Sequence, residues 1–295
     1  MTSRKLQFAI FGNTYQPKKS ASMQKLLASL AQRQADVAIE RKFYNFLTSD
    51  QHLEVGSVQV FDGSDFQADF VISMGGDGTF LKAASRVGDK QIPILGVNMG
   101  RLGFLADIHA QDMEQTITAL YEGDYSLETR SVIRVETDGI PLDGYNCALN
   151  DVAVLKRDNA SMITLHCTIN GDYVATYQAD GMVISTPTGS TAYSLSNGGP
   201  IIVPGTHVFS LTAVAPHSLN VRPIVVSEDS EIQLTVESRT CQYLVALDGR
   251  SEPLPDSTRL IIRKAPYRVR VIKRAGSKYF HTLREKMMWG ADTRG

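Results

Sequence analysis

Residues 70–79 read Phe-Val-Ile-Ser-Met-Gly-Gly-Asp-Gly-Thr. The run Phe70–Met74 is short and apolar, which is typical of a buried strand. The glycine-rich residues that follow lead directly into a helical pattern over Thr79–Val87. A buried strand that passes through a tight turn into a helix is the repeating unit of open α/β sheets. We therefore predict an α/β architecture around this stretch.

The sequence on both sides of this stretch repeats the alternation. Leu6–Phe11 and Ile92–Val97 are apolar runs that predict two more strands. Apolar residues at helical spacing within Met23–Ala31 and Met113–Leu120 predict two more helices. Strands that alternate with helices in this way imply a parallel sheet that is covered on both faces.

After about residue 125 the sequence becomes rich in short β-like runs. Asn170-Gly171 lies between two such runs and is a strong signal for a two-residue hairpin, and Asp138-Gly139 is a second. This part is predicted to be an antiparallel sandwich or a pair of packed sheets. The predicted strands are Ser131–Thr137, Cys147–Lys156, Met162–Ile169, Tyr173–Tyr177, Met182–Thr186, Phe209–Ala215, Glu231–Val236, Tyr243–Leu247, Thr258–Arg263 and Val269–Lys273.

The tail Phe280–Trp289 returns to helical spacing and needs a surface on which to bury Phe280, Leu283 and Trp289. The N-terminal domain is the expected partner. The prediction is thus a two-domain chain, with residues 1–124 and 277–295 in an α/β domain and residues 125–276 in a β-rich domain. The absence of a low-complexity linker suggests that the domains abut, with a cleft between them.

The composition is that of an ordinary globular protein. Thirty basic and 31 acidic residues leave a formal charge of −1, whereas binding to nucleic acid or to a membrane surface usually requires a basic face. We therefore expect no partner of either kind. The three widely spaced cysteines, Cys147, Cys167 and Cys241, fit neither a disulfide framework nor a zinc site. No apolar run reaches membrane-spanning length, so we expect a soluble protein of the cytoplasm.

The turn Gly75-Gly76-Asp77-Gly78-Thr79 is a candidate phosphate site. Its glycines let the backbone approach a ligand closely, and the free N–H groups of a helix start favour phosphate. The spacing matches neither a Rossmann fingerprint nor a P-loop. A carboxylate in such a cradle repels phosphate unless it has a task, such as accepting a hydroxyl proton or holding Mg²⁺. The alternative is that Asp77 caps the helix. Lys82, one turn further on, either reaches the phosphate or is solvated.

Three further segments are candidates for ligand binding. Asn98–Leu105 places two glycines after a strand, where open α/β sheets bind ligands, although an ordinary connection also fits. Asn150-Asp151 interrupts an apolar run and indicates either a bulge or a ligand site, because burying unpaired polar groups costs about 1–3 kcal/mol. After Asp180-Gly181, the segment Ser185–Ser194 is rich in small hydroxyl residues and glycine. It predicts a site for phosphate or sugar oxygens, with Tyr193 against a base; the alternative is a flexible surface loop.

Taken together, these segments resemble the NAD kinase family. The glycine-Asp turn alone is shared with diacylglycerol-type lipid kinases and, more distantly, with phosphofructokinases, but the serine-threonine segment and the Asn-Asp pair are far more specific. The sequence differs from common family members at Arg250, where a glutamine often stands, and at Ser161 and Gln178, which are often basic. The resemblance rests on Gly75–Thr79, Asn98–Leu105, Asn150-Asp151, Asp180-Gly181, Ser185–Tyr193, Pro216–Leu219, Arg222-Pro223, Asp248-Gly249 and the ending Phe280–Trp289.

The resemblance implies transfer of the γ-phosphate of ATP, with Mg²⁺ or another divalent ion, to the 2′-hydroxyl of the adenosine ribose of NAD, giving NADP and ADP. It also implies an active site between the two domains and a homo-oligomer, either a dimer or a tetramer. Asp77 would accept the hydroxyl proton, and Gly75, Gly76 and Thr79 would contact the phosphates of ATP. No protein ligand of the metal is assigned. The implied NAD-binding residues are Asp77, Gly78, Lys82, Asn150, Asp151, Asp180, Thr191, Ala192, Tyr193, Ser194, Leu195 and Ser196.

Two other functions compete with this interpretation. A lipid kinase built around the same turn predicts an apolar acyl pocket or a membrane-facing patch, which the near-neutral charge and the polar segment 185–196 argue against. A nucleotide-sensing protein without catalysis would tolerate the loss of Asp77, whereas an enzyme would not.

Overall fold

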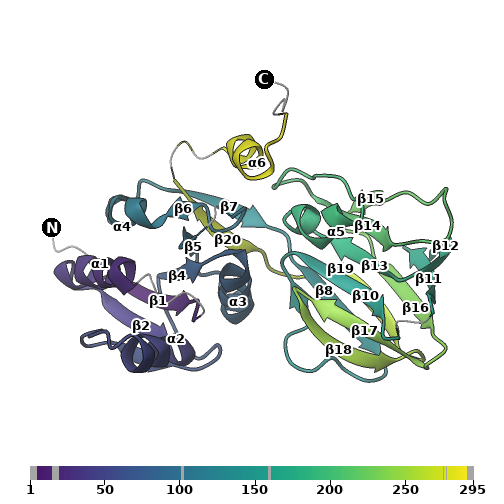
Figure 1. The fold of residues 1–295 in the computed structure, drawn as a ribbon, viewed down its shortest axis with the longest axis horizontal. Helices are drawn as coiled ribbons and strands as arrows, with labels where there is room; N and C mark the ends of the chain where they lie inside the picture. The colour runs from purple at the N-terminus through teal and green to yellow at the C-terminus, as the bar shows by residue number, and fades with distance from the viewer. Residues whose placement is uncertain are drawn as a thin grey trace. The chain divides into compact units, whose positions relative to one another are not determined.

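The computed structural model describes residues 5–14, 20–100, 103–158, 161–274, 276 and 278–290. The chain divides into two compact units: a first unit of residues 1–129 and 269–295, and a second unit of residues 130–268 (Figure 1). These boundaries differ from the predicted 124/125 and 276/277. The cause is the same at both ends, because β7 (Ser126–Arg130) and β20 (Val269–Lys273) lie in the sheet of the first unit.

The first unit contains a largely parallel sheet with the strand order β3-β2-β1-β4-β5-β20-β7, and β6 pairs with β5. The pairs β1/β2, β1/β4, β2/β3, β4/β5, β5/β20 and β5/β6 are all parallel. The predicted parallel α/β architecture is therefore confirmed. The strands are β1 (Gln7–Gly12), β2 (Asp36–Glu40), β3 (Gln59–Phe61), β4 (Phe70–Gly75), β5 (Ile94–Asn98) and β6 (Ile108–His109), together with β7 and β20.

Helices pack against the sheet of the first unit through apolar side chains. Phe8, Ile10 and Ile72 share one core cluster with residues of α1 and α4. By contrast, α3 sends the ring of Phe80 to Gly96 of β5, where an added Cβ would lie only 3.0 Å from the ring. The helices of this unit are α1 (Ser20–Gln32), α2 (Arg41–Asn45), α3 (Asp77–Val87), α4 (Met113–Glu122) and α6 (Tyr279–Met287).

The C-terminal helix α6 belongs to the first unit, as predicted, but it buries less than predicted. Leu283 is buried, and the ring of Tyr279 lies 6.1 Å from that of Phe104. Phe280 and Trp289 are each 56% exposed. The helix therefore docks through the row Tyr279, Leu283 and Lys286, whereas Arg284 and Glu285 are exposed. No helix of the described residues is long and apolar enough to span a membrane.

The second unit is formed by two six-stranded sheets whose assigned pairs are antiparallel. The first has the order β15-β14-β13-β10-β17-β18 and the second β12-β11-β16-β19-β8-β9. One core cluster joins both sheets, which confirms the predicted packed antiparallel sheets. The strands are β8 (Ile133–Asp138), β9 (Cys147–Ala148), β10 (Asp151–Lys156), β11 (Ile163–Ile169), β12 (Asp172–Ala179), β13 (Gly181–Ser185), β14 (Val208–Val214), β15 (Ile224–Ser227), β16 (Ile232–Glu237), β17 (Gln242–Leu247), β18 (Arg250–Pro255) and β19 (Arg259–Lys264).

Of the two predicted hairpins, one is confirmed and one is wrong. Asn170 and Gly171 both have positive φ, 53° and 85°, and join Ile169 to its partner Asp172 as a type I′ turn requires. After Asp138-Gly139, however, the chain runs through residues 139–146 before β9 pairs with β8. Pro141 in that segment has no N–H to give to a ladder, so no second strand begins there.

The predicted strand Cys147–Lys156 is two strands in different sheets. Cys147–Ala148 is β9 and pairs with β8, whereas Asp151–Lys156 is β10 and pairs with β13 and β17. The chain crosses from one sheet to the other at Leu149-Asn150. Such a corner leaves backbone N–H groups outside both ladders, and these groups need other partners.

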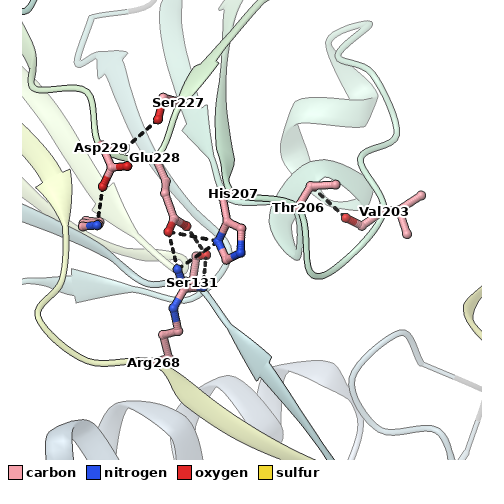
Figure 2. Close-up of polar contacts among 9 residues, drawn as sticks. Ser131, Val203, Thr206, His207, Ser227, Glu228, Asp229 and Arg268 are labelled. Carbon is pink, nitrogen blue, oxygen red and sulfur yellow. Dashed lines mark hydrogen bonds and ion pairs between the residues drawn. The ribbon is translucent and has the colours of Figure 1, made fainter.

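The chain passes between the units after Thr129 and after Arg268. The buried carboxylate of Glu228 contacts a residue near each of these points, Ser131 and Arg268. Glu228 is 3% exposed. It accepts a 2.5 Å hydrogen bond from the Ser131 hydroxyl and forms an ion pair with Arg268, and His207 Nδ1 lies 3.1 Å from its Oε1 (Figure 2). Arg268 also donates to the Ser131 hydroxyl at 2.9 Å. We call Ser131, His207, Glu228 and Arg268 the Glu228 cluster.

Candidate functional site

The strand order of the first unit creates a reversal point between β1 and β4. From β1 the chain proceeds through β2 to β3 on one side, and then from β4 to β5 on the other. Open α/β sheets bind ligands outside the carboxyl ends of the strands at such a point. The residues found there are Asn13, whose N–H donates to Met74 O at 3.0 Å, and the turn that begins at Gly75.

The glycines of this turn have different surroundings. A Cβ on Gly75 would lie 2.2 Å from Thr79 Oγ1, so the protein itself requires glycine at that position. A Cβ on Gly76 or Gly78 would have no described residue beyond its own chain neighbours and helix within 4 Å. Packing of the described residues therefore does not explain Gly76 and Gly78, and the absence of a Cβ leaves space beside the backbone at both positions.

Asp77 is the first residue of α3, but it does not act as its cap. Gly76 is the N-cap, and the Asp77 carboxylate accepts 3.0 Å hydrogen bonds from the N–H groups of Phe104, Leu105 and Ala106. Lys286 Nζ of α6 lies 3.3 Å from Oδ2. The carboxylate thus ties the glycine turn to a distant loop and to the C-terminal helix.

These contacts keep Asp77 ionised. Burial alone raises the pKa of its carboxyl, but the N–H of Ala106, the ammonium of Lys286 and the N–H groups of Phe104 and Leu105 lower it, and the pKa stays below its ordinary value. Hydrogen bonds to the charged form of a carboxyl have this effect in general. The turn therefore presents a full negative charge at neutral pH.

The loop after β5 is shaped to receive the Asp77 carboxylate. A Cβ on Gly103 would lie 2.0 Å from Asp77 Oδ1, so only glycine fits. Asn98 Oδ1 accepts the N–H of Gly100 at 2.6 Å, and Asn98 Nδ2 is buried with no hydrogen-bond partner among the described residues. Arg101 and Leu102 of the predicted segment Asn98–Leu105 lie outside the described residues. Gly103 thus has a structural reason that the sequence alone did not reveal.

Lys82 of α3 is engaged elsewhere. Its ammonium pairs at 2.9 Å with Oε1 of Glu40, a buried residue at the end of β2. Glu40 Oε2 in turn accepts the Phe43 N–H at the start of α2. The Lys82 side chain is therefore not simply solvated, and its contact with a phosphate stays a prediction.

In the second unit, Asn150-Asp151 lies at the corner where the chain changes sheets. The N–H groups of Leu149, Asn150 and Asp151 donate to the Asp248 carboxylate at 2.8, 2.7 and 3.2 Å. Thr186 closes the other side, donating its N–H to Asn150 O at 2.9 Å and its hydroxyl to Leu149 O at 2.6 Å. The corner is therefore a fully hydrogen-bonded backbone feature rather than a bulge.

The two carboxylates at this corner have unusual acidities. Burial, with a smaller contribution from the negative charge of Asp248, raises the pKa of Asp151 to about 7. Burial also raises the pKa of Asp248, although its three N–H donors and Arg250 oppose the rise. Among the described residues, no hydrogen bond or ion pair reaches the Asp151 carboxylate. A buried carboxyl without partners that titrates near neutral pH is a candidate for ligand recognition.

The serine-threonine segment is ordered, so the predicted alternative of a flexible loop is wrong. Residues 181–190 are all buried. Ser190 Oγ accepts the Ile202 N–H at 3.0 Å, and the Ser194 hydroxyl lies 3.1 Å from that of Thr212. These hydroxyls therefore hold the segment together. Tyr193 is 39% exposed, and Ser196 is also exposed.

Asp180 does not stand alone, because its carboxylate forms a 2.7 Å ion pair with Lys156 Nζ. Both side chains are partly exposed, at 34% and 23%. Lys156 lines a groove of about 670 Å³ at one end of the sheets, together with Gln178 and Arg239.

The described residues contain no group of three His, Cys, Asp or Glu side chains that could hold a metal ion. At the glycine turn only Asp77 offers carboxylate oxygens, and three N–H groups and Lys286 already surround them. This donor set fits Mg²⁺ bound to substrate phosphates, which usually keeps several waters and takes one or two protein carboxylates.

Sequence reasoning missed the contacts that organise these sites. Phe104–Ala106 acts through its backbone N–H groups, which carry no sequence signal. Asp248-Gly249 entered only as part of the family resemblance, although Asp-Gly between two β-like runs is a hairpin signal. Lys286 also entered only through the resemblance, and its contact with Asp77 spans 209 positions of sequence.

Comparison with known proteins agrees with this arrangement. Residues 8–125 match the model of the ATP-NAD kinase N-terminal domain, and residues 149–274 match that of the C-terminal domain. The chain is 55% identical to an NAD kinase of Bacteroides fragilis over 98% of its length and all of that protein, and 46% identical to one of Porphyromonas gingivalis over 98% of its length and 99% of that protein.

Solved structures show the same fold. A yeast NADH kinase complexed with NADH has a TM-score of 0.89 at 19% identity, covering 99% of this chain and 90% of that one. An NAD kinase from Archaeoglobus fulgidus in complex with ATP has a TM-score of 0.76 at 25% identity, covering 96% and 99%. With both domain models matched in order and near-full-length relatives at this identity, the chain belongs to the ATP-NAD kinase family.

Proposed function

We propose that this enzyme transfers the γ-phosphate of ATP to the 2′-hydroxyl of the adenosine ribose of NAD, giving NADP and ADP. The observation that carries the proposal is the 55% identity to a named NAD kinase over the whole length of that protein. All the motifs from Gly75 to Asp248 lie within the aligned length. The geometry of the glycine turn and of the Asn150-Asp151 corner supports roles for both units.

In this proposal Asp77 accepts the proton of the ribose hydroxyl. Its lowered pKa makes it a weak base, which suits a loose transition state in which the attacking hydroxyl loses its proton late. Gly75, Gly76 and Thr79 are proposed to lie at the phosphates of ATP, and Gly78 against the dinucleotide. The open space beside Gly76 and Gly78 supports this assignment. Lys82 joins the phosphate contacts only if its pair with Glu40 opens.

NAD is proposed to bind at the Asn150-Asp151 corner and along Thr191–Ser196, with Asp180 completing the pocket. An ionised Asp151 accepts hydrogen bonds from ribose hydroxyls, and the Asn150 amide recognises a base edge. The exposed part of the Tyr193 ring offers a flat surface for a base. Because Ser194 Oγ bonds to Thr212, Ser194 is proposed to contribute through its backbone or by shaping the pocket.

The divalent cation is proposed to arrive on the triphosphate as MgATP. When bound there, Mg²⁺ neutralises the charge that develops on the transferring phosphoryl group. The protein contributes the helix-start N–H groups after Gly76, which favour phosphate, and at most the Asp77 carboxylate.

We also propose that the enzyme works as a homo-oligomer in the cytoplasm. The strand β12 lies at the edge of its sheet and exposes Tyr173 and Val174, and an exposed edge strand of this kind is normally covered. Three free cysteines fit a reducing compartment. Light scattering should report a dimer or tetramer; monomer alone at micromolar concentration would contradict the assembly.

The activity is tested by incubating the purified enzyme with NAD, ATP and Mg²⁺ and measuring NADP with a dehydrogenase that accepts only NADP. Reactions without ATP or without Mg²⁺ are the controls. A parallel reaction with diacylglycerol and labelled ATP tests the lipid-kinase alternative. Phosphorylation of the lipid in place of NAD would reverse the assignment.

Asp77→Asn tests the catalytic role. The variant cannot take the proton, so kcat should fall about 10²–10⁴-fold, while the affinity for NAD, measured by calorimetry, changes little. Because the asparagine NH₂ group would face the N–H donors of residues 104–106, we also expect a loss of roughly 1–3 kcal/mol in unfolding free energy. Lys286→Gln is the matched control, since it removes the ion pair and keeps the three N–H bonds. A folded Asp77→Asn variant within threefold of the wild-type kcat would rule out proton acceptance by Asp77.

A further inference from the structure

Asp248 does more than its hairpin requires. Asp248-Gly249 joins Leu247 of β17 to Arg250 of β18, and both turn residues have positive φ, 48° and 81°. A type I′ turn accepts Asn or Gly at the first position as well as Asp. The hairpin alone therefore gives no reason for a carboxylate there.

The reason lies across the sheet, at the corner where the chain changes sheets. Asp248 Oδ2 accepts the N–H of Leu149, and Oδ1 accepts those of Asn150 and Asp151. The Asp248 N–H donates back to Asp151 O at 3.1 Å. A carboxylate accepts at both oxygens, whereas an asparagine has one accepting oxygen and a donating NH₂ group. Only an ionised Asp at position 248 satisfies all three N–H groups.

We propose that Asp248 is a positioning residue for NAD: its carboxylate fixes the peptide groups that carry the Asn150 and Asp151 side chains, and so sets the direction in which both face the dinucleotide. This inference rests on the proposed function. Asp248 need not touch the substrate, because it acts through the corner. Hydrogen bonds of this kind around ligand-contacting groups hold them in productive geometry.

The same contact gives Asp248 an electrical effect on Asp151. The charge of Asp248 contributes to the raised pKa of Asp151, about 7. The other titratable groups around Asp248 are Arg250, which is always charged, and Tyr145 and Cys147, which burial keeps neutral by raising their pKa values. Asp151, whose pKa is about 7, changes its charge near neutral pH, and burial raises the pKa of Asp248 as well. Replacing Asp248 by a neutral residue should therefore lower the pKa of Asp151, whereas loss of an unrelated turn contact should not.

The test measures the KM for NAD and kcat between about pH 5.5 and pH 9, a range that brackets the Asp151 titration. In the wild type, the KM should rise as the pH falls below about 7, because a protonated Asp151 accepts ribose hydroxyls poorly. Asp248→Asn should raise the KM about tenfold or more at pH 8 with a smaller change in kcat, and should move the inflection to lower pH. Asp151→Asn should abolish the inflection.

Two further variants keep the test decisive. Asp248→Glu keeps the charge but displaces the oxygens, so the KM should rise while the inflection stays near its wild-type pH. If Asp248→Asn does not fold, this variant still tests positioning. Asp256→Asn is the matched control, because Asp256 also accepts a backbone N–H at a turn of the same unit, from Ser238 at 3.4 Å; its KM and pH profile should match the wild type.

The outcomes separate the inference from the function on which it rests. If the wild type forms no NADP, the proposed function fails and the inference falls with it. If Asn150→Ala and Asp151→Ala leave the KM unchanged, the corner is not the NAD site, and the inference falls for that reason. If the wild type is active and both of those variants raise the KM, then an unchanged KM in Asp248→Asn and Asp248→Glu overturns the inference alone.

Discussion

At position 78, neither the helix nor the packing of the described residues gives a reason for glycine. It lies in the first turn of α3, and a Cβ there would meet no described residue beyond its own helix and chain neighbours. Glycine disfavours helix by roughly 0.5–1 kcal/mol relative to alanine. The proposed contact between Gly78 and the dinucleotide would account for glycine at this position.

Gly78→Ala should therefore separate stability from activity. The variant should fold at least as stably as the wild type, because alanine favours the helix, and its kcat/KM for NAD should fall by tenfold or more because the methyl group occupies ligand space. Urea unfolding and steady-state kinetics measure the two effects. Gly75→Ala is the contrasting variant: its Cβ would lie 2.2 Å from Thr79 Oγ1, so it should lose stability as well. A fully active Gly78→Ala would place the dinucleotide elsewhere.

The raised pKa of the Asp151 carboxyl makes the stability of the protein depend on pH. Its pKa is about 7 in the folded enzyme and about 3.9 in an unfolded chain. The folded state therefore holds this proton to higher pH. The resulting contribution to stability is complete below about pH 4 and is lost as the pH rises through about 7.

Asp151→Asn should remove the decrease in stability that the wild type shows as the pH rises through about 7. The unfolding free energy of the variant minus that of the wild type should grow by on the order of 2 kcal/mol from about pH 5.5 to pH 8. The reason is that only the wild type releases the Asp151 proton over this range. Urea unfolding at both pH values gives the comparison. An equal difference at the two pH values would mean that Asp151 titrates normally.

At the scale of elements, the Glu228 cluster connects segments that are far apart in sequence. Ser131 precedes β8, Glu228 follows β15, and Arg268 precedes β20. A buried carboxylate with these partners contributes little net stability, but removing its charge leaves its partners unsatisfied. The loops that carry these residues therefore depend on one another.

Glu228→Gln should lower the unfolding free energy by about 2–4 kcal/mol, because the new NH₂ group faces the donors of Ser131 or Arg268. The neighbouring Asp229→Asn is a matched control. Asp229 pairs with Lys264 at the surface, and its replacement should leave the stability almost unchanged. Equal losses of unfolding free energy in the two variants would show that the buried contacts of Glu228 stabilise the protein no more than the surface pair of Asp229 does.

Elements whose signals are local could be predicted, and those that depend on distant partners could not. The run Phe70–Met74 and the turn Asn170-Gly171 were found because neighbouring residues determine them. The Asp77 carboxylate, predicted either as a base or as a helix cap, bonds to N–H groups 27 to 29 positions away. Asp248 acts on residues 97 to 99 positions away. Such pairings exist only once the sheets have formed.

At the scale of the whole molecule, the first unit depends on both ends of the chain. Its strand β20 lies between β5 and β7, with Val271 and Ile272 buried, and α6 buries Leu283. The C-terminal residues are therefore a structural part of the α/β sheet rather than a tail.

A chain that ends at Arg268 should fail to form a stable first unit, because β5 and β7 lose the strand between them. A chain that ends at Gly290 keeps every described element and is the control. Solubility on expression and the cooperativity of thermal unfolding report the result. A shortened chain that unfolds cooperatively at the wild-type temperature would contradict the dependence on β20.

The placement of β20 has a consequence for biosynthesis. The ribosome releases residues 1–129 first, but their sheet cannot close until residues 130–268 have followed, which takes about 7–28 seconds at typical elongation rates. During that interval the part of β5 around Ile94 lacks its partner β20, and an unpaired edge invites wrong pairing. The contiguous second unit can complete its sheets before the first. Lys286 follows β20 in the sequence, so the Asp77 carboxylate gains its cation only after β20 has been synthesised.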